Sequence, residues 1–287
     1  MAVAIAGRAS AHTPLRGLDQ FNRRGKAGEV GYCVGGTRPY TLEFQNDADV
    51  ICLLLGDLVT ETKFEDDTER PLLFAGESSA FHPRGGNVRV RATEVHYGFI
   101  AFSYQPEFEG RFDDVDRQRT RRGGSRNNIR RDAITALSRS ARERLASDRA
   151  FDDFEVESLA TRVYLETMRS LGAVGEEGRH RLSDHEFDLI AAYVEDELGN
   201  EITCASLATV ARVPLRVVFD GMKMRTGMSP YRYVMEKRVA RAYHLLRNST
   251  MPISEIALVC GFSSQQHLTS TFSTKLGRAP RQVRLGG

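Results

Sequence analysis

The last third of the chain carries one pattern twice, and this repeat constrains the fold more than any other feature of the sequence. Three apolar positions recur at a spacing of 49 residues, namely Leu207/Ile256, Ala208/Ala257 and Val213/Phe262. Four further positions recur at a spacing of 50, namely Val218/Leu268, Met222/Phe272, Gly227/Gly277 and Pro230/Pro280. One extra residue in the second turn explains the change of spacing. Each copy therefore predicts two short helices around a turn, a helix–turn–helix unit, followed by the same exit turn.

A helix–turn–helix unit lays its second helix in the major groove, so two units suggest that one chain reads two stretches of DNA. The second copy is the more regular, with Ile253–Ala257, then Cys260-Gly261-Phe262, then a polar helix and Gly277-x-x-Pro280. This ordered run, with its Gly and Pro residues, resembles the AraC/XylS family of bacterial transcription regulators. The resemblance covers roughly Leu182 to Arg284. The alternative is an unrelated helical bundle.

A long amphipathic helix is predicted between the two units. Ser229 and Pro230 are the residue types of an N-cap and a first-turn proline. Apolar residues then recur at spacings of three and four, namely Tyr231, Val234, Met235, Val239, Ala242, Leu245 and Leu246. A helix of roughly 18 residues spans about 27 Å, which suits recognition helices about 34 Å apart on one face of a duplex. One chain is therefore expected to span two successive major grooves.

Polar residues of the second recognition helix are the first candidates for base contacts. Ser263 and Gln266 have the spacing of a capping box, and a helix is predicted over 264–275. Glutamine can pair bidentately with adenine, and threonine can meet a thymine methyl group or a phosphate. The family resemblance carries base contacts onto Gln265, Gln266, Thr269 and His267. Ser270 departs from the arginine often found at its position, which removes a charged contact.

The first unit is less regular. Val213-Pro214 replaces the usual serine cap, and Arg212 stands where a turn glycine is expected. Proline suits the start of a helix, so a helix is still predicted. Its outward face is expected to carry Arg216, Phe219, Asp220 and Lys223, of which the first three are predicted base contacts. Arginine can contact guanine, while aspartate can accept from cytosine or repel phosphate, and phenylalanine can meet thymine or pack on the linker helix.

The charge of the chain is unevenly distributed. The net charge of +2 comes from 40 Lys and Arg and 38 Asp and Glu. Residues 202–287 hold 13 of the basic and 3 of the acidic residues, which leaves 27 basic and 35 acidic residues elsewhere. A basic module on an acidic body fits a polyanionic partner, although a merely soluble basic surface is common. Phosphate contacts are predicted for the cations that flank the recognition helices, with solvated surface charge as the alternative: Lys223, Arg225, Lys275, Arg278 and Arg281.

The N-terminal half is predicted to be rich in β-strands between about residues 40 and 104. Val50–Leu55 is an apolar run typical of a buried strand, and Gly56-Asp57 predicts a hairpin to a strand over 58–63. Further strands are expected around Val88–Val90 and over 95–104. Several short strands with turns favour an antiparallel barrel or sandwich. The family resemblance implies an effector-binding domain of the cupin-like (jelly-roll) type here.

Two helices are predicted over about residues 129–171, and the second has a clear apolar stripe from Val156 to Leu171. The stripe is expected to be buried against the β-domain or against a second subunit, in a homodimer through helices 129–171. The preceding segment, 117–131, holds seven arginines and no acidic residue. A flexible solvated loop is favoured there over a contact with nucleic acid.

The predicted fold class is therefore α+β. A β-rich effector-binding or dimerisation domain is expected over 1–171, with strands about 40–104 and helices about 129–171. A linker follows over 172–181. An all-α DNA-binding domain of the AraC type, with two helix–turn–helix units joined by a long helix, is expected over 182–287.

Motifs for catalysis are missing from the sequence. The β-region offers only His82 and His96, without a close His-x-His, and there is no phosphate-binding loop or hydrolase motif. We expect no enzyme, no metal and no cofactor, and the two histidines are weak candidates only for lining an effector pocket. The four cysteines form no CxxC pair and no apolar stretch approaches a membrane span, so a cytoplasmic protein is expected.

The leading hypothesis is a sequence-specific DNA-binding transcriptional regulator that a small molecule of unknown identity controls through the N-terminal domain. Its partners would be double-stranded promoter DNA and RNA polymerase. Activation is the commoner mode in the family, and no residue decides it against repression. Two alternatives remain: a small-molecule enzyme with an appended DNA-binding domain, and an effector-independent DNA-scaffolding protein.

Overall fold

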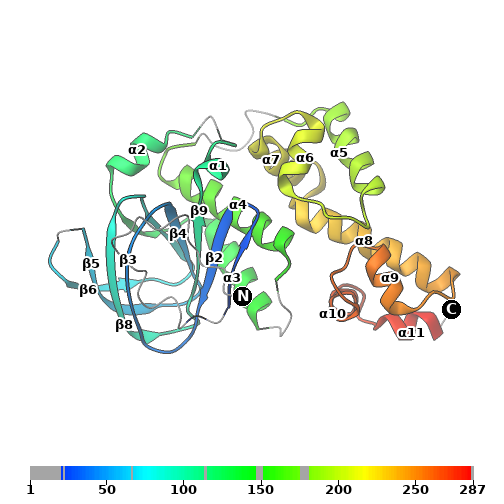
Figure 1. The fold of residues 1–287 in the computed structure, drawn as a ribbon, viewed down its shortest axis with the longest axis horizontal. Helices are drawn as coiled ribbons and strands as arrows, with labels where there is room; N and C mark the ends of the chain where they lie inside the picture. Colours follow the sequence, from blue (N-terminus) through cyan, green and yellow to red (C-terminus); the bar gives the residue numbers. More distant parts are fainter. Residues whose placement is uncertain are drawn as a thin grey trace. The chain divides into compact units, whose positions relative to one another are not determined.

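The computed structural model describes residues 21, 23–65, 67–112, 115–146, 151–174 and 181–285. The chain folds into two compact units, which Figure 1 shows as ribbons. The first comprises Met1–Asp148 and Leu159–Glu176, and the second comprises Arg149–Ser158 and Glu177–Gly287. Most of the predicted linker, residues 175–180, lies outside the described residues.

The first unit contains two antiparallel sheets. The larger sheet has six strands in the order β1 (Arg23–Ala27), β2 (Val30–Gly35), β9 (Phe99–Tyr104), β4 (Asp49–Leu54), β7 (Ser78–His82) and β10 (Arg126–Ile129). The smaller sheet has four strands in the order β3 (Tyr40–Gln45), β8 (Asn87–Val95), β5 (Leu58–Phe64) and β6 (Arg70–Phe74). The predicted mixed chain with a β-rich N-terminal domain is confirmed.

The predicted hairpin at Gly56-Asp57 is wrong. β4 pairs with β7 and β9, whereas β5 pairs with β6 and β8, so this turn carries the chain from one sheet to the other. The corner is tight, because a Cβ on Gly56 would lie 2.0 Å from the carbonyl oxygen of His96. Asp57 Oδ1 accepts a hydrogen bond from the backbone N–H of Gly76 at 2.7 Å. These contacts fix the corner between the sheets.

The core of the first unit lies between the two sheets. Alternate side chains of each strand point inward, since successive residues of a strand face opposite sides. Leu42 and Val90 of the smaller sheet thus share one apolar cluster with Leu54, Ala80 and Phe99 of the larger sheet. The cluster surrounds a cavity that is described below.

Helices α3 (Asp132–Leu145) and α4 (Asp153–Ser170) pack on the larger sheet in the first unit. Ser138 of α3 donates a hydrogen bond to the carbonyl oxygen of Leu54 at 2.7 Å. Tyr104 of β9 donates to the carbonyl oxygen of Ala160 at 3.0 Å, and its ring lies 5.0 Å from that of Tyr164. These contacts bury the apolar stripe within one chain, so the stripe no longer argues for a homodimer.

The arginine-rich segment 117–131 is folded, and the prediction of a flexible loop is wrong. It forms α2 (Arg117–Arg122) and β10, after the short α1 (Pro106–Glu109). Arg121 is held by two buried carboxylates: its Nε lies 3.1 Å from Asp49 Oδ2, and its Nη2 lies 2.7 Å from Glu109 Oε2. Burial and the neighbouring Asp49 raise the pKa of Glu109 to about 7. Partners far away in the sequence therefore order this segment.

The described part of the second unit is helical. Its helices are α5 (Asp184–Asp196), α6 (Cys204–Ala211), α7 (Leu215–Thr226), α8 (Pro230–Asn248), α9 (Ile253–Val259), α10 (Gln265–Leu276) and α11 (Pro280–Leu285). The start of α4 also belongs to this unit: Phe154 packs edge-on against Tyr231 at 5.5 Å, and Glu157 accepts a hydrogen bond from the backbone N–H of Cys204 at 2.9 Å. The hydrogen bond from Cys204 to Glu157 satisfies one of the backbone N–H donors at the N-terminus of α6.

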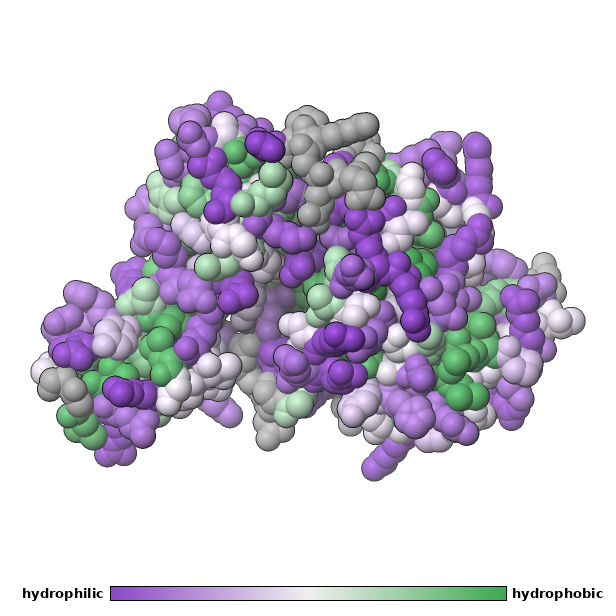
Figure 2. Space-filling model, turned by 180° about the vertical axis from the view of Figure 1, so that it is seen from behind, coloured by the Kyte–Doolittle hydropathy of each residue, from purple (hydrophilic) through white to green (hydrophobic). Residues whose placement is uncertain are grey.

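The surface drawn in Figure 2 is mainly hydrophilic, with small groups of hydrophobic residues between the polar ones. Large apolar side chains that reach the surface include Leu258, Leu276 and Leu285. None of the helices within the described ranges has the length and hydrophobicity needed to cross a membrane.

Candidate nucleic-acid interface

The two predicted helix–turn–helix units share one backbone frame. In the first, Arg212 follows α6 in the left-handed conformation (φ 55°), and α7 ends at Gly227 (φ 69°). In the second, Gly261 lies in the turn after α9 (φ 78°), and α10 ends at Gly277 (φ 67°). The left-handed residues let the chain reverse direction after each helix. Both copies of the repeat are therefore confirmed as the same local fold.

Helix α8 joins the two units, as predicted. Ser229 accepts a hydrogen bond from the backbone N–H of Arg232, and Pro230 is the first helical residue. The 19 residues of α8 correspond to a length of about 28 Å. Its buried face includes Val234, Val239 and Ala242. This face packs against helices of both helix–turn–helix units, including α7 and α9.

A buried arginine of α8 lies between the segment before α6 and the turn of the second helix–turn–helix unit. Arg238 of α8 donates from Nε to the carbonyl oxygen of Leu198 at 3.1 Å and from Nη2 to that of Asn200 at 3.0 Å. A Cβ on Gly261 would lie 2.3 Å from the same Leu198 oxygen and 2.7 Å from Arg238 Nε. The segment before α6 and the turn after α9 therefore contact one another directly, and this contact restrains the spacing of the two units.

The second recognition helix begins one residue later than the sequence predicts. Ser264 is its N-cap and accepts a hydrogen bond from the backbone N–H of His267 at 3.1 Å, so the predicted capping box of Ser263 and Gln266 is wrong. Gln265 and Gln266, the first two helical residues, are exposed. Thr269 is half-buried, and Leu268 and Phe272 are buried, as predicted. The helix thus presents two amides at its N-terminal end.

His267 is not available for a base contact, which corrects the prediction. The side chain is buried, its ring packs edge-on against Phe262 at 5.2 Å, and Nδ1 lies 3.0 Å from Ser263 Oγ. The buried face of an amphipathic helix is wider than one row of side chains, so a residue beside Leu268 can lie inside. His267 therefore stabilises the turn before the helix.

Helix α7 differs from α10, because most of its length is buried. The predicted outward positions of three candidate base contacts are wrong, since the exposed fractions are 8% for Arg216, 4% for Phe219 and 6% for Asp220. Arg216 Nε lies 3.4 Å from Asp220 Oδ2, one helical turn away. Such an i, i+4 pair offsets both charges inside the protein.

Of the five predicted phosphate-binding cations, four are exposed and Lys275 is half-buried. Lys223, at the end of α7, is exposed. Arg278 and Arg281, around the start of α11, are also exposed. A cation at the surface beside a recognition helix is the common arrangement for contacts with phosphate.

Arg225 and Lys275 each contact an acidic residue of the same domain. Arg225 donates to the carbonyl oxygen of Leu182 at 3.1 Å, pairs with Asp184 and lies over the ring of Phe187. Lys275 forms an ion pair with Glu236 of α8. These contacts give both residues a structural role that the sequence did not reveal.

The comparisons with known proteins fall on this domain. Residues 207–286 match the protein-family model described as "Helix-turn-helix domain". The HTH-type transcriptional activator RhaS of Escherichia coli O1:K1 is 33% identical over 99 residues, which are 34% of this chain and 36% of RhaS. These two matches support an AraC-type helix–turn–helix domain in the C-terminal part of the chain. The chain spans about a third of the length of RhaS.

Two solved structures are similar to the AraC-type domain. One is a transcriptional regulator of Chromobacterium violaceum, described as containing an AraC-type DNA-binding domain, with 28% sequence identity and a TM-score of 0.34. The match covers 35% of this chain and 90% of the regulator's chain. The DNA-binding domain of AdpA, solved with a target DNA, is 29% identical with a TM-score of 0.34 and covers 36% of this chain and 93% of that chain.

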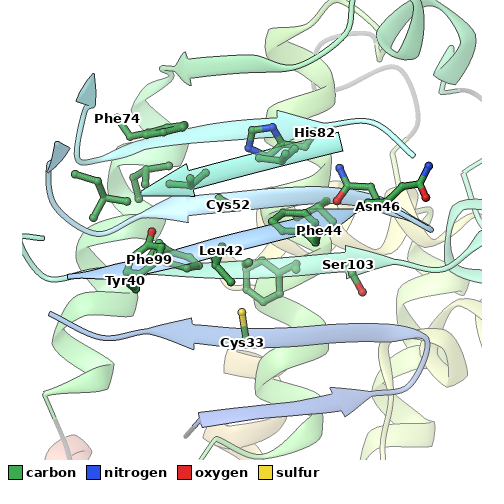
Figure 3. Close-up of a pocket in the computed structure, with 18 of the residues that line it drawn as sticks. Cys33, Tyr40, Leu42, Phe44, Asn46, Cys52, Phe74, His82, Phe99 and Ser103 are labelled. Atoms are coloured by element: carbon green, nitrogen blue, oxygen red, sulfur yellow. The ribbon is translucent and has the colours of Figure 1, made fainter. Parts of the chain in front are cut away.

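Outside the AraC-type domain, the two histidine candidates have different positions. His82 of β7 is buried, and its side chain lines the cavity between the two sheets (Figure 3). His96 is exposed in the turn between β8 and β9, outside the cavity lining, so its prediction as a pocket residue is wrong. Strand alternation alone does not separate the two, because which side of a strand faces the core depends on the opposite sheet.

Proposed function

We propose that this protein is a sequence-specific DNA-binding transcription activator. The observation that carries the proposal is the AraC-type domain, which contains two helix–turn–helix units with the same backbone fold. In the second of them, α10 exposes Gln265 and Gln266. RhaS, which shares this domain, is named as a transcriptional activator, and this supports activation over repression and over an enzyme.

Base recognition is assigned to the start of α10. The amide of Gln265 or Gln266 can donate to adenine N7 and accept from adenine N6. The hydroxyl of Thr269 already donates to the carbonyl oxygen of Gln265 at 2.9 Å, so its methyl group is the part that can meet thymine. Specificity for A·T pairs in the groove that α10 occupies follows from these residue types.

Phosphate contacts are assigned to Lys223, Arg278 and Arg281. These exposed cations belong to both units and give no sequence information themselves, but they position the domain on the duplex. Arg225 and Lys275 can add contacts with phosphate if they leave their ion pairs with Asp184 and Glu236. One chain would thus engage two successive major grooves, reading bases with α10 and holding the backbone beside α7.

Control by a small molecule is assigned to the first unit. Two antiparallel sheets around a cavity fit a cupin-like jelly roll, the architecture that holds small ligands in many proteins. Binding there would shift the equilibrium between conformations with different promoter affinity or contact with RNA polymerase.

The test is a selection of preferred sites from a random duplex library with the full chain. The proposal predicts one preferred sequence with A·T pairs at defined positions. Removing one phosphate contact, as in Arg278→Ala, should weaken binding to all sequences alike. The negative slope of log K against log salt should become less steep by about 1. Thr274→Ala, on the exposed far end of α10, is the matched control and should change neither property. A chain that recovers only random sequence would be a scaffolding protein instead.

A further inference from the structure

The size and lining of the cavity between the sheets of the first unit indicate what kind of molecule it can hold. Its volume is about 100 Å³, which is the scale of an engineered cavity of about 150 Å³ that binds benzene. Most of its walls are apolar side chains from both sheets, including Cys33, Leu42, Cys52, Phe74, Val88 and Phe99. A space of this size and lining suits a molecule of about one ring.

Polar side chains gather at one end of this cavity. Val50 of β4 pairs with His82 on one side and with Ser103 on the other, so these two side chains share one level of the sheet. Asn46 joins them, because its Nδ2 donates to the carbonyl oxygen of Pro83 at 3.2 Å, next to His82. Figure 3 shows Asn46, His82 and Ser103 toward one end and Tyr40, Phe74 and Phe99 toward the other.

Two of these polar groups lack hydrogen-bond partners among the residues that the structure describes. Asn46 is 3% exposed and Ser103 is 8% exposed, yet Asn46 Oδ1 and Ser103 Oγ have no hydrogen-bond partner. A buried polar atom without a partner destabilises a protein unless another group satisfies it. A ligand hydroxyl group at this end of the cavity can donate to the Asn46 amide oxygen or accept from the Ser103 hydroxyl group.

The charges around the cavity favour a neutral molecule. No Lys or Arg is found in the lining, which consists wholly of described residues. His82 stacks on Phe64, its Nδ1 lies 3.2 Å from Ser125 Oγ, and burial lowers its pKa to about 4, so the ring is uncharged at neutral pH. Exposed Asp47 and Gln45 line the same pocket beside Asn46. An anion would lack a counter-charge there and would face the carboxylate of Asp47.

We propose that this cavity binds a neutral molecule of about one ring, with a hydroxyl group at the end of the cavity where Asn46 and Ser103 lie. The inference rests on the proposed function, because it gives the chemical class of the effector that the first unit recognises. The ring lies among the apolar side chains, and the hydroxyl group lies at the end formed by Asn46, His82 and Ser103.

Three probes of one size test the charge preference: benzyl alcohol, benzoate and benzylammonium. Their binding to the full chain is measured by calorimetry at neutral pH. Benzyl alcohol is expected to bind saturably and at least tenfold more tightly than either ion. Equal or tighter binding of benzoate or benzylammonium, or no saturable binding of benzyl alcohol, overturns the inference.

Two variants test the location. Ser103→Ala should weaken binding of benzyl alcohol several-fold while the melting temperature stays equal or rises, because the variant removes a hydroxyl that has no partner. Ala101→Leu fills the cavity and should abolish binding in a chain that still shows the native circular dichroism spectrum. Thr93→Ala, on the exposed face of β8, is the control and should bind normally. Benzyl alcohol that binds all three variants alike would place its site elsewhere and overturn the inference.

The same preparation is tested on duplex DNA without any probe. A chain that selects a DNA sequence but binds no benzyl alcohol overturns this inference and leaves the proposed function intact. A chain that binds benzyl alcohol in the cavity but no specific DNA overturns the proposed function alone.

Discussion

The two helix–turn–helix units have the same backbone but different surfaces. Both carry left-handed residues at matching positions, Arg212 with Gly261 and Gly227 with Gly277. The recognition helix α10 exposes Gln265 and Gln266 in its first turn, whereas α7 is buried from Leu215 to Met222. A few apolar and glycine positions thus set the frame, while the surface varies independently. The difference assigns base reading to α10.

The turns differ as well. Arg212 is exposed, so a Cβ in the left-handed conformation meets solvent. At the matching position, Gly261 is packed against Leu198 and Arg238, where a Cβ has no space. The same backbone conformation therefore tolerates a side chain in one unit and requires glycine in the other.

The largest expected effect comes from Gly261→Ala. The left-handed conformation costs an alanine about 1–2 kcal/mol, and the contact with Leu198 O adds overpacking, so we expect a loss of about 3 kcal/mol of unfolding free energy. Gly277→Ala is the matched control, because its Cβ would have no atom within 4 Å, and it should cost only about 1 kcal/mol. Denaturant titration of both full-length variants measures the gap, and equal losses would show that packing at Gly261 is unimportant.

The next largest effect is expected from Arg238→Met. Methionine retains much of the side-chain volume but leaves the carbonyl oxygens of Leu198 and Asn200 without their donor, at a cost of about 2 kcal/mol. Because Arg238 binds the segment before α6 and packs against Gly261 in the turn after α9, hydrogen exchange should become faster in both α6 and α9. Lys237→Met, at a neighbouring exposed ion pair with Glu195, is the control and should cost at most about 1 kcal/mol. Faster exchange in one unit alone would argue against the connection.

Gln265→Ala and His267→Ala separate reading from folding within α10. Removing the exposed Gln265 amide should cost about 1–3 kcal/mol of discrimination at particular base pairs and leave the melting temperature unchanged. Removing the buried His267 ring should lower the melting temperature and weaken binding to all sequences alike. Competition binding with single-base variants of the selected site, alongside thermal unfolding, distinguishes the two patterns. Uniform weakening by Gln265→Ala would argue against a base contact.

The smallest expected effect is a gain in stability from Arg212→Gly. Glycine adopts the left-handed conformation without the steric cost of a Cβ, so we expect the unfolding free energy to rise by about 1 kcal/mol or less, since glycine also gains freedom in the unfolded chain. Thermal unfolding measures the change. A clear loss of stability would mean that the Arg212 side chain holds the first turn together, which would reverse the comparison with Gly261.

The frame of the AraC-type domain could be predicted because its signals are local. Glycines end helices, prolines lie at helix starts, and the apolar spacing of Leu268 and Phe272 identifies a buried helix face. The burial of His267 and Arg216 could not be predicted in this way, because partners such as Phe262 or Asp220 decide whether a polar side chain lies inside. Ser264 was missed as the N-cap because two neighbouring serines offer the same chemistry.

The first unit was less predictable because its pairings are distant in sequence. Gly56-Asp57 signals a turn, but nothing local indicates that β4 and β5 enter different sheets. The arginine-rich segment was expected to be a loop, because Asp49 and Glu109, which hold Arg121, lie outside it. The polar end of the cavity could not be predicted either. Asn46, His82 and Ser103 are distant in sequence, and the pairing of the strands brings them to one cavity.

The central claim is that one chain reads bases with α10 while its first helix–turn–helix unit contacts the DNA backbone at the adjacent major groove. Hydroxyl-radical footprinting and methylation interference of the full chain on its selected site test this directly. The account predicts protection on one face of the duplex at two major grooves one helical turn apart, with Gln265→Ala altering base interference in one of them. Protection of a single groove, or no preference over random competitor, would contradict it.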